Sequence, residues 1–329
     1  MLLNSACGRE SDGPLRCEVV PLPDHQVSFT IDGKERLRWH FGPQYPRPFF
    51  YPLNGPSGVS LTRMGHPGAQ NHDHHRSVWF AHQSVNDIDF WSDNTSATVR
   101  QKFWYRYRDG NEECLMASSL GWFDERGVEV MQQDLVVAVL PLADNEYTVE
   151  FQITLSPGAQ HETVTLGKTN FGILAMRVSK SLSAFFGGGT ISDSEGNTGE
   201  EQIFGKQARW MDYSGPVAVG TGATRQVVAE GITCFDHPQN LRHPTFWHVR
   251  SDGWMGASYG MQAAHPIDRQ NPLTLRYLIH VHSGRYDAET AAGILRQFEG
   301  RPGFLIRKAK PQEMHQQYEV ERLGKSPGL

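Results

Sequence analysis

Histidine is concentrated in two stretches of this chain. Residues 66–91 read HPGAQNHDHHRSVWFAHQSVNDIDFW, and residues 235–250 read FDHPQNLRHPTFWHVR. Both stretches also carry arginine, aspartate and tryptophan. Imidazole can transfer protons, ligate a metal ion or contact an oxyanion near neutral pH. Any one of these histidines could simply hydrogen-bond buried backbone, but the two clusters together predict one pocket to which both contribute.

Acid/base catalysis needs titratable groups that face the same substrate from different environments. The candidate catalytic residues are His75, His82, Glu195, Asp236, His237, His243 and His248. We expect one histidine, His243 or His248, to act with one carboxylate, either Glu195 or Asp236. Glu195 belongs to a glycine-rich stretch, residues 185–205, which we expect to form a loop. Because glycine permits close backbone approach to a ligand, residues 187–199 are predicted to border the pocket.

Metal binding is a second chemistry that the histidines allow. Residues i and i+2 of an extended segment share a face, so His72 and His74 could point together, as could His280 and His282. An H-x-H pair is a common beginning of a metal site, completed by a carboxylate or a third histidine. The sequence therefore leaves two possibilities for the cofactor, none or one divalent metal ion.

Aromatic and arginine side chains lie beside both clusters. A sugar ring has an apolar face and a polar rim, so aromatic faces next to hydrogen-bonding groups suit it. The forked donors of arginine could hold a substrate oxygen or carboxylate, although each arginine could equally form a buried ion pair. The candidate substrate-binding residues are Arg76, Trp79, Trp91, Trp247 and Arg250.

The rest of the chain is predicted to be strands that position these residues. Long runs rich in valine, leucine, threonine and aromatics, such as residues 128–140 and 147–155, are separated by short glycine or aspartate turns. Only residues 288–299 and 312–321 have a helical pattern. The predicted fold is all-β, a large antiparallel β-sandwich with few helices, for which the galactose-mutarotase-like supersandwich is one candidate. We expect a disordered lead-in (1–15), a single domain (16–310) and a C-terminal tail (311–329).

Composition excludes several classes of function. The chain has 329 residues and a net charge of -5, with no basic run that would form a nucleic-acid footprint. No apolar run is long enough to span a bilayer, so no membrane partner is expected. Four scattered cysteines without a CxxC pair argue against a structural zinc site and a disulfide framework. The start lacks the charged and apolar regions of a signal peptide, which predicts a cytoplasmic protein, or a periplasmic one if the printed start is truncated.

Several motifs resemble the bacterial family called PmoA-like. They are RPFFYPLNGPSGVSLTR, HDHHRSVWFAHQSVNDIDFW, SEGNTGE, WMDYSGP and FDHPQNLRHPTFWHVR, within residues 40–285. Leu241 stands where the resemblance leads us to expect proline, and Ser258-Tyr259 where it leads us to expect an Asn-Pro-Phe type run. The family name comes from methane oxygenase, but a membrane oxygenase subunit needs transmembrane helices, which this sequence does not predict. The resemblance implies a β-sandwich with a histidine-rich pocket, in a family common near sugar-catabolism genes.

The leading prediction is a carbohydrate-active enzyme that acts on a small sugar or keto-glycoside by acid/base chemistry: epimerisation, elimination or hydrolysis. The alternatives are a metal-dependent sugar lyase or hydrolase and a non-catalytic carbohydrate-binding module. A binding module needs stacking aromatics but no acid/base pair. Hydrogen-bond reach between a pocket histidine and Glu195 or Asp236 therefore separates enzyme from binder. The sequence predicts no oligomeric state.

Overall fold

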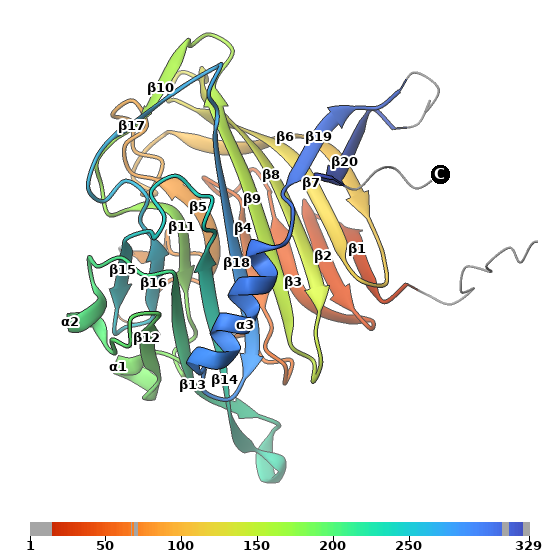
Figure 1. Cartoon of the computed structure of the whole chain (residues 1–329), viewed down its shortest axis with the longest axis vertical. Helices are drawn as coiled ribbons and strands as arrows, with labels where there is room; N and C mark the ends of the chain where they lie inside the picture. The colour runs from red at the N-terminus through yellow and green to blue at the C-terminus, as the bar shows by residue number, and fades with distance from the viewer. Residues whose placement is uncertain (1–14, 67, 69–71, 311–315, 325–329) are drawn as a thin grey trace, which may run out of the picture.

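Two eight-stranded antiparallel sheets pack face to face in the computed structural model, which describes residues 15–66, 68, 72–310 and 316–324 (Figure 1). The first sheet has the order β1 (Cys17–Leu22), β2 (Gln26–Ile31), β3 (Lys34–His40), β4 (Phe49–Leu53), β5 (Val78–His82), β11 (Gly172–Arg177), β16 (Trp254–Ala257) and β15 (Trp247–Arg250). The second sheet has the order β12 (Thr190–Asp193), β13 (Trp210–Val219), β14 (Gln226–Asp236), β18 (Leu273–Ser283), β9 (Tyr147–Pro157), β8 (Glu129–Pro141), β7 (Cys114–Phe123) and β6 (Thr98–Arg108).

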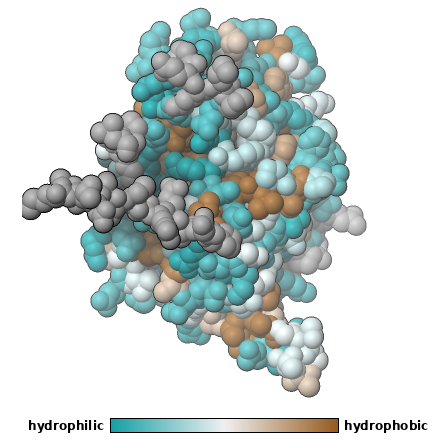
Figure 2. All heavy atoms as spheres, turned by 90° about the vertical axis from the view of Figure 1, so that its right-hand side faces the viewer, coloured by the Kyte–Doolittle hydropathy of each residue, from teal (hydrophilic) through white to brown (hydrophobic). Residues whose placement is uncertain are grey.

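The predicted all-β sandwich of large antiparallel sheets with few helices is confirmed. Alternation along the strands builds its core: Leu275, Tyr277 and Ile279 of β18 point between the sheets, whereas Leu278 packs on the outer face of the second sheet. A smaller pair joins β10 (Thr163–Leu166) to β17 (His265–Asp268). The β13–β14 hairpin projects beyond the sandwich and carries a short 3-10 turn, η2 (Gly222–Thr224), at its end (Figure 1). Hydrophobic side chains are exposed on this projection (Figure 2), and Val227 is 69% exposed.

Helix α3 (Ala288–Glu299) confirms the predicted helix at residues 288–299. Asp287 caps it by accepting hydrogen bonds from the backbone N–H groups of Glu289 and Thr290. Its buried face, which includes Leu295 and Phe298, packs on the outer face of the second sheet. Two further helices, α1 (Ala184–Gly187) and α2 (Glu200–Ile203), are single turns. None of the helices in the described ranges is long and apolar enough to cross a membrane.

The helix expected at residues 312–321 is wrong for its described part. Tyr318–Arg322 forms β20, which pairs with β19 (Phe304–Lys308), and this hairpin covers β7 and β8 on the outer face of the second sheet. Arg322 bonds the buried Glu150 and Glu113, at 3.0 and 2.7 Å, which fastens part of the predicted tail to the domain. The predicted lead-in, except residue 15, and residues 311–315 lie outside the described residues.

Candidate functional site

Strand alternation decides which predicted residues can reach a site. In β15, Trp247 and Val249 point into the core, so His248 and Arg250 point to the outer face of the first sheet. Trp247 is fully buried, and its indole donates a hydrogen bond to the carbonyl of Ala208. In β5, Trp79 lies on the outer face. Two of the three strand residues proposed for substrate binding, Trp79 and Arg250, are therefore on the same side.

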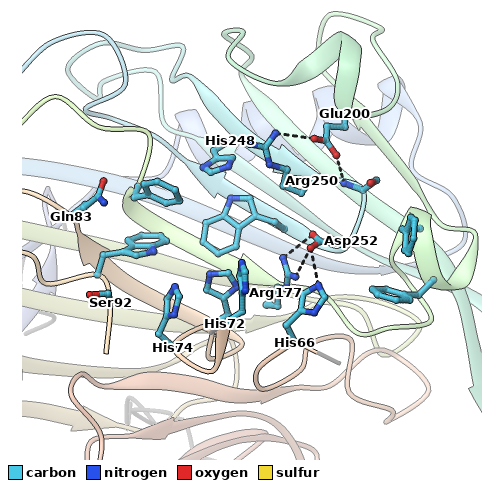
Figure 3. Close-up of a pocket in the computed structure, with 17 residues that line it drawn as sticks. His66, His72, His74, Gln83, Ser92, Arg177, Glu200, His248, Arg250 and Asp252 are labelled. Atoms are coloured by element: carbon cyan, nitrogen blue, oxygen red, sulfur yellow. Dashed lines mark hydrogen bonds and ion pairs between the residues drawn. The ribbon is translucent and has the colours of Figure 1, made fainter. Parts of the chain in front are cut away.

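A pocket of about 720 Å³ opens on this outer face, over strands β5, β11, β16 and β15 (Figure 3). Its lining combines histidines, aromatic rings and two arginine–carboxylate pairs: His66, His72, His74, His75, Gln83, Trp91, Ser92, Phe171, Arg177, Phe185, Phe186, Glu200, His248, Arg250, Ser251, Asp252 and Trp254. His248 lies across the pocket from His72 and His74 (Figure 3). Of the second histidine cluster, His248 and Arg250 therefore reach the pocket that the first cluster lines.

Trp254 lies in the floor of this pocket, and its neighbours across the sheet are Arg177 and Arg250. Gly256 pairs with Ala175 on one side and His248 on the other. A Cβ at Gly256 would lie 3.4 Å from the Trp254 indole, an ordinary van der Waals contact, so the indole packs directly beside this glycine. The Trp254 ring centroid is 4.7 Å from that of His75 and 5.4 Å from that of His248. An imidazole from each cluster therefore contacts the same indole.

The histidines of residues 66–75 form one contact group. The ring centroids of His74 and His75 are 4.2 Å apart, and those of His72 and His75 are 4.9 Å apart. Burial, together with the charge of Arg47, lowers the pKa of His74 to about 4. Burial and the neighbouring His74 lower the pKa of His75 far below its ordinary value. These two imidazoles are therefore neutral near pH 7 and can accept or donate a hydrogen bond.

His248 has a defined tautomer. Its Nδ1 lies 3.2 Å from the backbone carbonyl of Asn170. Because a carbonyl oxygen only accepts, Nδ1 must carry the hydrogen, and Nε2 of the neutral ring keeps a lone pair. Burial, reinforced by the charge of Arg250, lowers the pKa of His248 to about 4. His248 is therefore a neutral imidazole at the pocket wall with Nε2 available as a base.

Both carboxylates of the pocket are engaged. Asp252 accepts two hydrogen bonds from Arg177, at 2.9 and 2.8 Å, and one from His66 at 3.0 Å. Burial alone would raise the pKa of Asp252, but the bonds and charge of Arg177 outweigh it and hold the pKa below the ordinary value. Glu200 accepts from Arg250 at 2.8 Å and from the backbone N–H of Ser251 at 2.7 Å. These groups position the pocket wall with their charges already paired.

Several donors in the floor have no such partner. The indole nitrogens of Trp79, Trp91 and Trp254 and Nδ1 of His75 are buried, and none has a hydrogen-bond partner among the described residues. Buried polar groups in folded proteins are nearly always satisfied. Indole N–H groups only donate, but these nitrogens are shielded from solvent, and Trp79 does not line the pocket. They therefore lie unsatisfied within the aromatic packing of the floor.

Three residues of the second histidine cluster do not line the pocket. His243 Nδ1 lies 2.8 Å from Asp236, which also accepts from Asn240 and the backbone of Thr245. This carboxylate, whose pKa is raised by burial, clamps the loop that follows β14. His237 bonds the buried Arg276 at 2.9 Å. The histidine–carboxylate pair expected from the sequence exists as His243–Asp236, but it lies outside the pocket lining.

Other predicted residues also lie elsewhere. Glu195 is 50% exposed and faces Arg209 at 3.7 Å. His82 is buried on the core side of β5, where its Nδ1 accepts from the backbone of Ser84. Arg76 forms two bonds to Asp93 and does not line the pocket.

The glycine-rich stretch is not one long loop, because it contains α1, β12 and α2. Phe185 and Phe186 before residues 187–199 and Glu200 after them line the pocket, while residues 187–199 do not.

The histidines considered for metal binding are divided between two sites. His72 and His74 line the pocket with ring centroids 6.0 Å apart. His280 and His282 do share a face, as alternation predicts, but they lie on the second sheet, beside Glu146 and Asp212. Within the described ranges, no three or more His, Cys, Asp or Glu side chains are grouped to hold a metal ion.

Three pocket residues were not predicted from the sequence: Arg177, Asp252 and Glu200. Asp252 follows the WHVR motif by two positions, and Glu200 ends the SEGNTGE motif, so both were within reach of a motif argument. Arg177 is isolated in sequence, and only the pairing of β11 with β16 brings it to Asp252.

The fold and the site define a β-sandwich protein with an aromatic, histidine-lined pocket on one outer sheet face. The chain belongs to a family of unknown function, DUF6807, whose model matches residues 26–296. No curated protein matches the sequence. Among solved structures, the chain is similar to heparinase III, studied with methylated lysines, at 9% identity and a TM-score of 0.30. The match covers 94% of this chain but only 41% of the heparinase III chain, and it is too distant to indicate function.

Proposed function

We propose that this protein is a carbohydrate-active enzyme that transfers protons at, or next to, the keto or anomeric carbon of a sugar or keto-glycoside. The observation that carries the proposal is the contact of Trp254 with two neutral imidazoles, His75 and His248, one from each histidine cluster. A sugar ring stacked on the Trp254 indole would have a potential base and a potential acid within reach of its polar rim.

His248 is the proposed base. Its Nε2 would take the proton from the carbon next to a carbonyl, and the electron pair would move to the carbonyl oxygen as an enolate. Arg250 has N–H groups beyond the one that bonds Glu200, and these would stabilise the enolate oxygen. Return of a proton from water to the opposite face of that carbon gives epimerisation. In elimination the enolate electron pair would form the new double bond and expel the alkoxide from the next carbon, and the proton held by His248 would pass to that oxygen, which leaves as an alcohol.

Epimerisation and elimination are favoured over hydrolysis. Most glycoside hydrolases use two carboxyl groups, one of which must be protonated or act as a nucleophile. In this pocket Asp252 is held by Arg177 and His66, and Glu200 by Arg250 and Ser251. Neither carboxylate is placed as a free acid or base.

The same pairing of carboxylates supports a second candidate, a non-catalytic sugar-binding module. Such a module needs the Trp254 floor but no proton transfer. Neither Glu195 nor Asp236 meets a pocket histidine, whereas Asp252 does, through His66. A metal-dependent lyase is separated from both by chelation. Activity lost on exhaustive chelation and regained with a divalent ion would favour it. The resemblance to the PmoA-like family stays a prediction.

The test is a screen of glycosides and keto-sugars for binding and turnover. We expect a hit that quenches tryptophan fluorescence and is converted by the wild-type protein. Trp254→Ala should weaken its binding by roughly tenfold or more, since buried tryptophans often carry 2 kcal/mol or more of binding energy. Trp210→Phe, on the outer face of the second sheet, is the matched control and should bind normally. Binding without turnover would select the binding module, and no binding at all would reject both.

A further inference from the structure

Phe185 is the most exposed large hydrophobic side chain in the described part of the chain, at 72%. It lies at the pocket, with the adjacent Phe186 also in the lining. Burying a phenylalanine side chain is favourable because it removes a large apolar surface from water. A solvent-exposed phenylalanine at the mouth of a pocket is therefore a surface that a ligand could cover.

The short helix that carries Phe185 is held firmly. The backbone N–H of Ala184 donates to the Tyr213 hydroxyl at 2.9 Å, and the N–H of Phe185 donates to the carbonyl of Ser251 at 2.8 Å. The N–H of Phe186 donates to the Ser183 hydroxyl at 3.2 Å. Three successive N–H groups are thus anchored, so the exposed ring stands on a fixed backbone.

The glycines after Phe186 make this arrangement possible. A Cβ at Gly187 would lie 1.9 Å from the carbonyl oxygen of Ser181, and one at Gly189 would lie 1.8 Å from that of Leu182. Real Cβ atoms do not approach oxygen this closely. Glycine at both positions lets α1 turn back tightly on residues 181–182, and the motif FFGGG therefore has a structural reason.

The same hydrogen bonds fix the position of the Phe185 ring relative to the proposed base, His248. Ser251 accepts from Phe185 and donates to Glu200, and Glu200 binds Arg250. Arg250 is two residues from His248 on the same face of β15. Phe185 and the proposed base are therefore positioned by one connected set of contacts.

We propose that Phe185 is a stacking platform for a second sugar ring, so that the ligand is a glycoside of at least two sugar rings and not a free monosaccharide. The inference rests on the proposed function of the pocket. The pocket volume of about 720 Å³ lies in the range that accommodates drug-sized ligands, which are larger than one sugar ring. The first ring occupies the Trp254 floor, and the second covers the exposed face of Phe185.

The experiment compares a monosaccharide with the disaccharide that contains it, both chosen from the screen. Wild-type protein should bind the disaccharide more tightly, and Phe185→Ala should lose roughly tenfold in disaccharide affinity, which corresponds to about 1.4 kcal/mol, because the second ring loses its aromatic contact. Monosaccharide affinity should stay within about twofold. Phe185→Tyr keeps an aromatic face and should restore the preference, and Val227→Ala, at another exposed site, is the control.

An unchanged disaccharide preference in Phe185→Ala would overturn this inference alone. A wild-type dimer that dissociates in Phe185→Ala, with sugar affinity unaltered, would also overturn it, because the ring would then belong to a contact between copies of the chain. If no sugar bound to the wild-type protein, or if binding survived Trp254→Ala, the proposed function itself would fail and this inference with it.

Discussion

The two outer faces of the sandwich both carry histidines, but they use them differently. On the second sheet, His280 lies 3.1 Å from Glu146 and His282 lies 3.0 Å from Asp212. Asp212 also accepts from Thr233 and Ser214. These imidazoles are buried, and each has a carboxylate of its own. On the first sheet, His75 and His248 face an open pocket and contact an indole.

On the proposed function, the hydrogen-bond partner, and not the residue type, separates the structural histidines of this molecule from those of the pocket. A carboxylate that completes the hydrogen bonds of a histidine leaves it no capacity for a ligand. His243 is likewise paired with a carboxylate, Asp236, although it lies only five positions from His248 in the sequence.

The largest expected effect is a loss of folding stability as the pH is lowered. Burial lowers the pKa of His82 to about 4; burial and Arg276 do so for His237, and burial and Arg250 for His248. From the ordinary value near 6.5 down to about 4, the unfolded chain binds a proton at each of these histidines and the folded chain does not. Stability therefore falls as the pH falls through this window, by up to roughly 1.4 kcal/mol per pH unit for each histidine.

Urea unfolding at several pH values between 7 and 4 measures this slope. His248→Gln should reduce it by about one proton, because glutamine does not titrate. A free energy of unfolding that is flat across the window would mean that these imidazoles are not held neutral.

The second prediction concerns the carboxylate-paired histidines on the outer face of the second sheet. Asp212→Ala leaves His282, Thr233 and Ser214 without their common acceptor in a buried site. Loss of one partner of a buried pair typically costs about 3–5 kcal/mol. Ligand binding at the pocket should be unaffected at a temperature where the variant is folded. If the free energy of unfolding fell by less than about 1 kcal/mol, Asp212 would not have the structural role assigned to it.

The third prediction contrasts two arginines proposed as anchors. Arg76 makes two bonds to Asp93 away from the pocket, whereas Arg250 makes one side-chain bond to Glu200 inside it. Replacing each by lysine keeps the charge and loses the fork. Arg76→Lys should lower the free energy of unfolding by about 1 kcal/mol and leave sugar affinity unchanged. Arg250→Lys should weaken sugar affinity and leave the free energy of unfolding unchanged. If the two variants changed sugar affinity and stability equally, the distinction between the two arginines would be wrong.

Alternation made much of this predictable from sequence. It gave the strands, the sandwich and the shared face of His280 with His282. It does not explain His72 and His74, because residues 72–74 form a turn and not an extended segment. It could not say that β5 ends with His82 on the core side, nor that β18 belongs to the other sheet, because both depend on strand pairing between distant segments. The pairing of Arg177 with Asp252 has the same origin. Motif membership alone was not sufficient either, because Glu200 ends the SEGNTGE motif and was missed, while Glu195 of the same motif does not line the pocket.

The most direct test is the turnover number of His248→Gln and His282→Gln on the substrate found in the screen. The pocket histidine should lower kcat by roughly 10²- to 10⁴-fold, the range for a lost general acid or base, with a free energy of unfolding within about 1 kcal/mol of wild type. The His282→Gln variant should be less stable than wild type but should keep the wild-type kcat when it is folded. Turnover that survives in His248→Gln, or that falls equally in both variants, would contradict the assignment of His248 as the base.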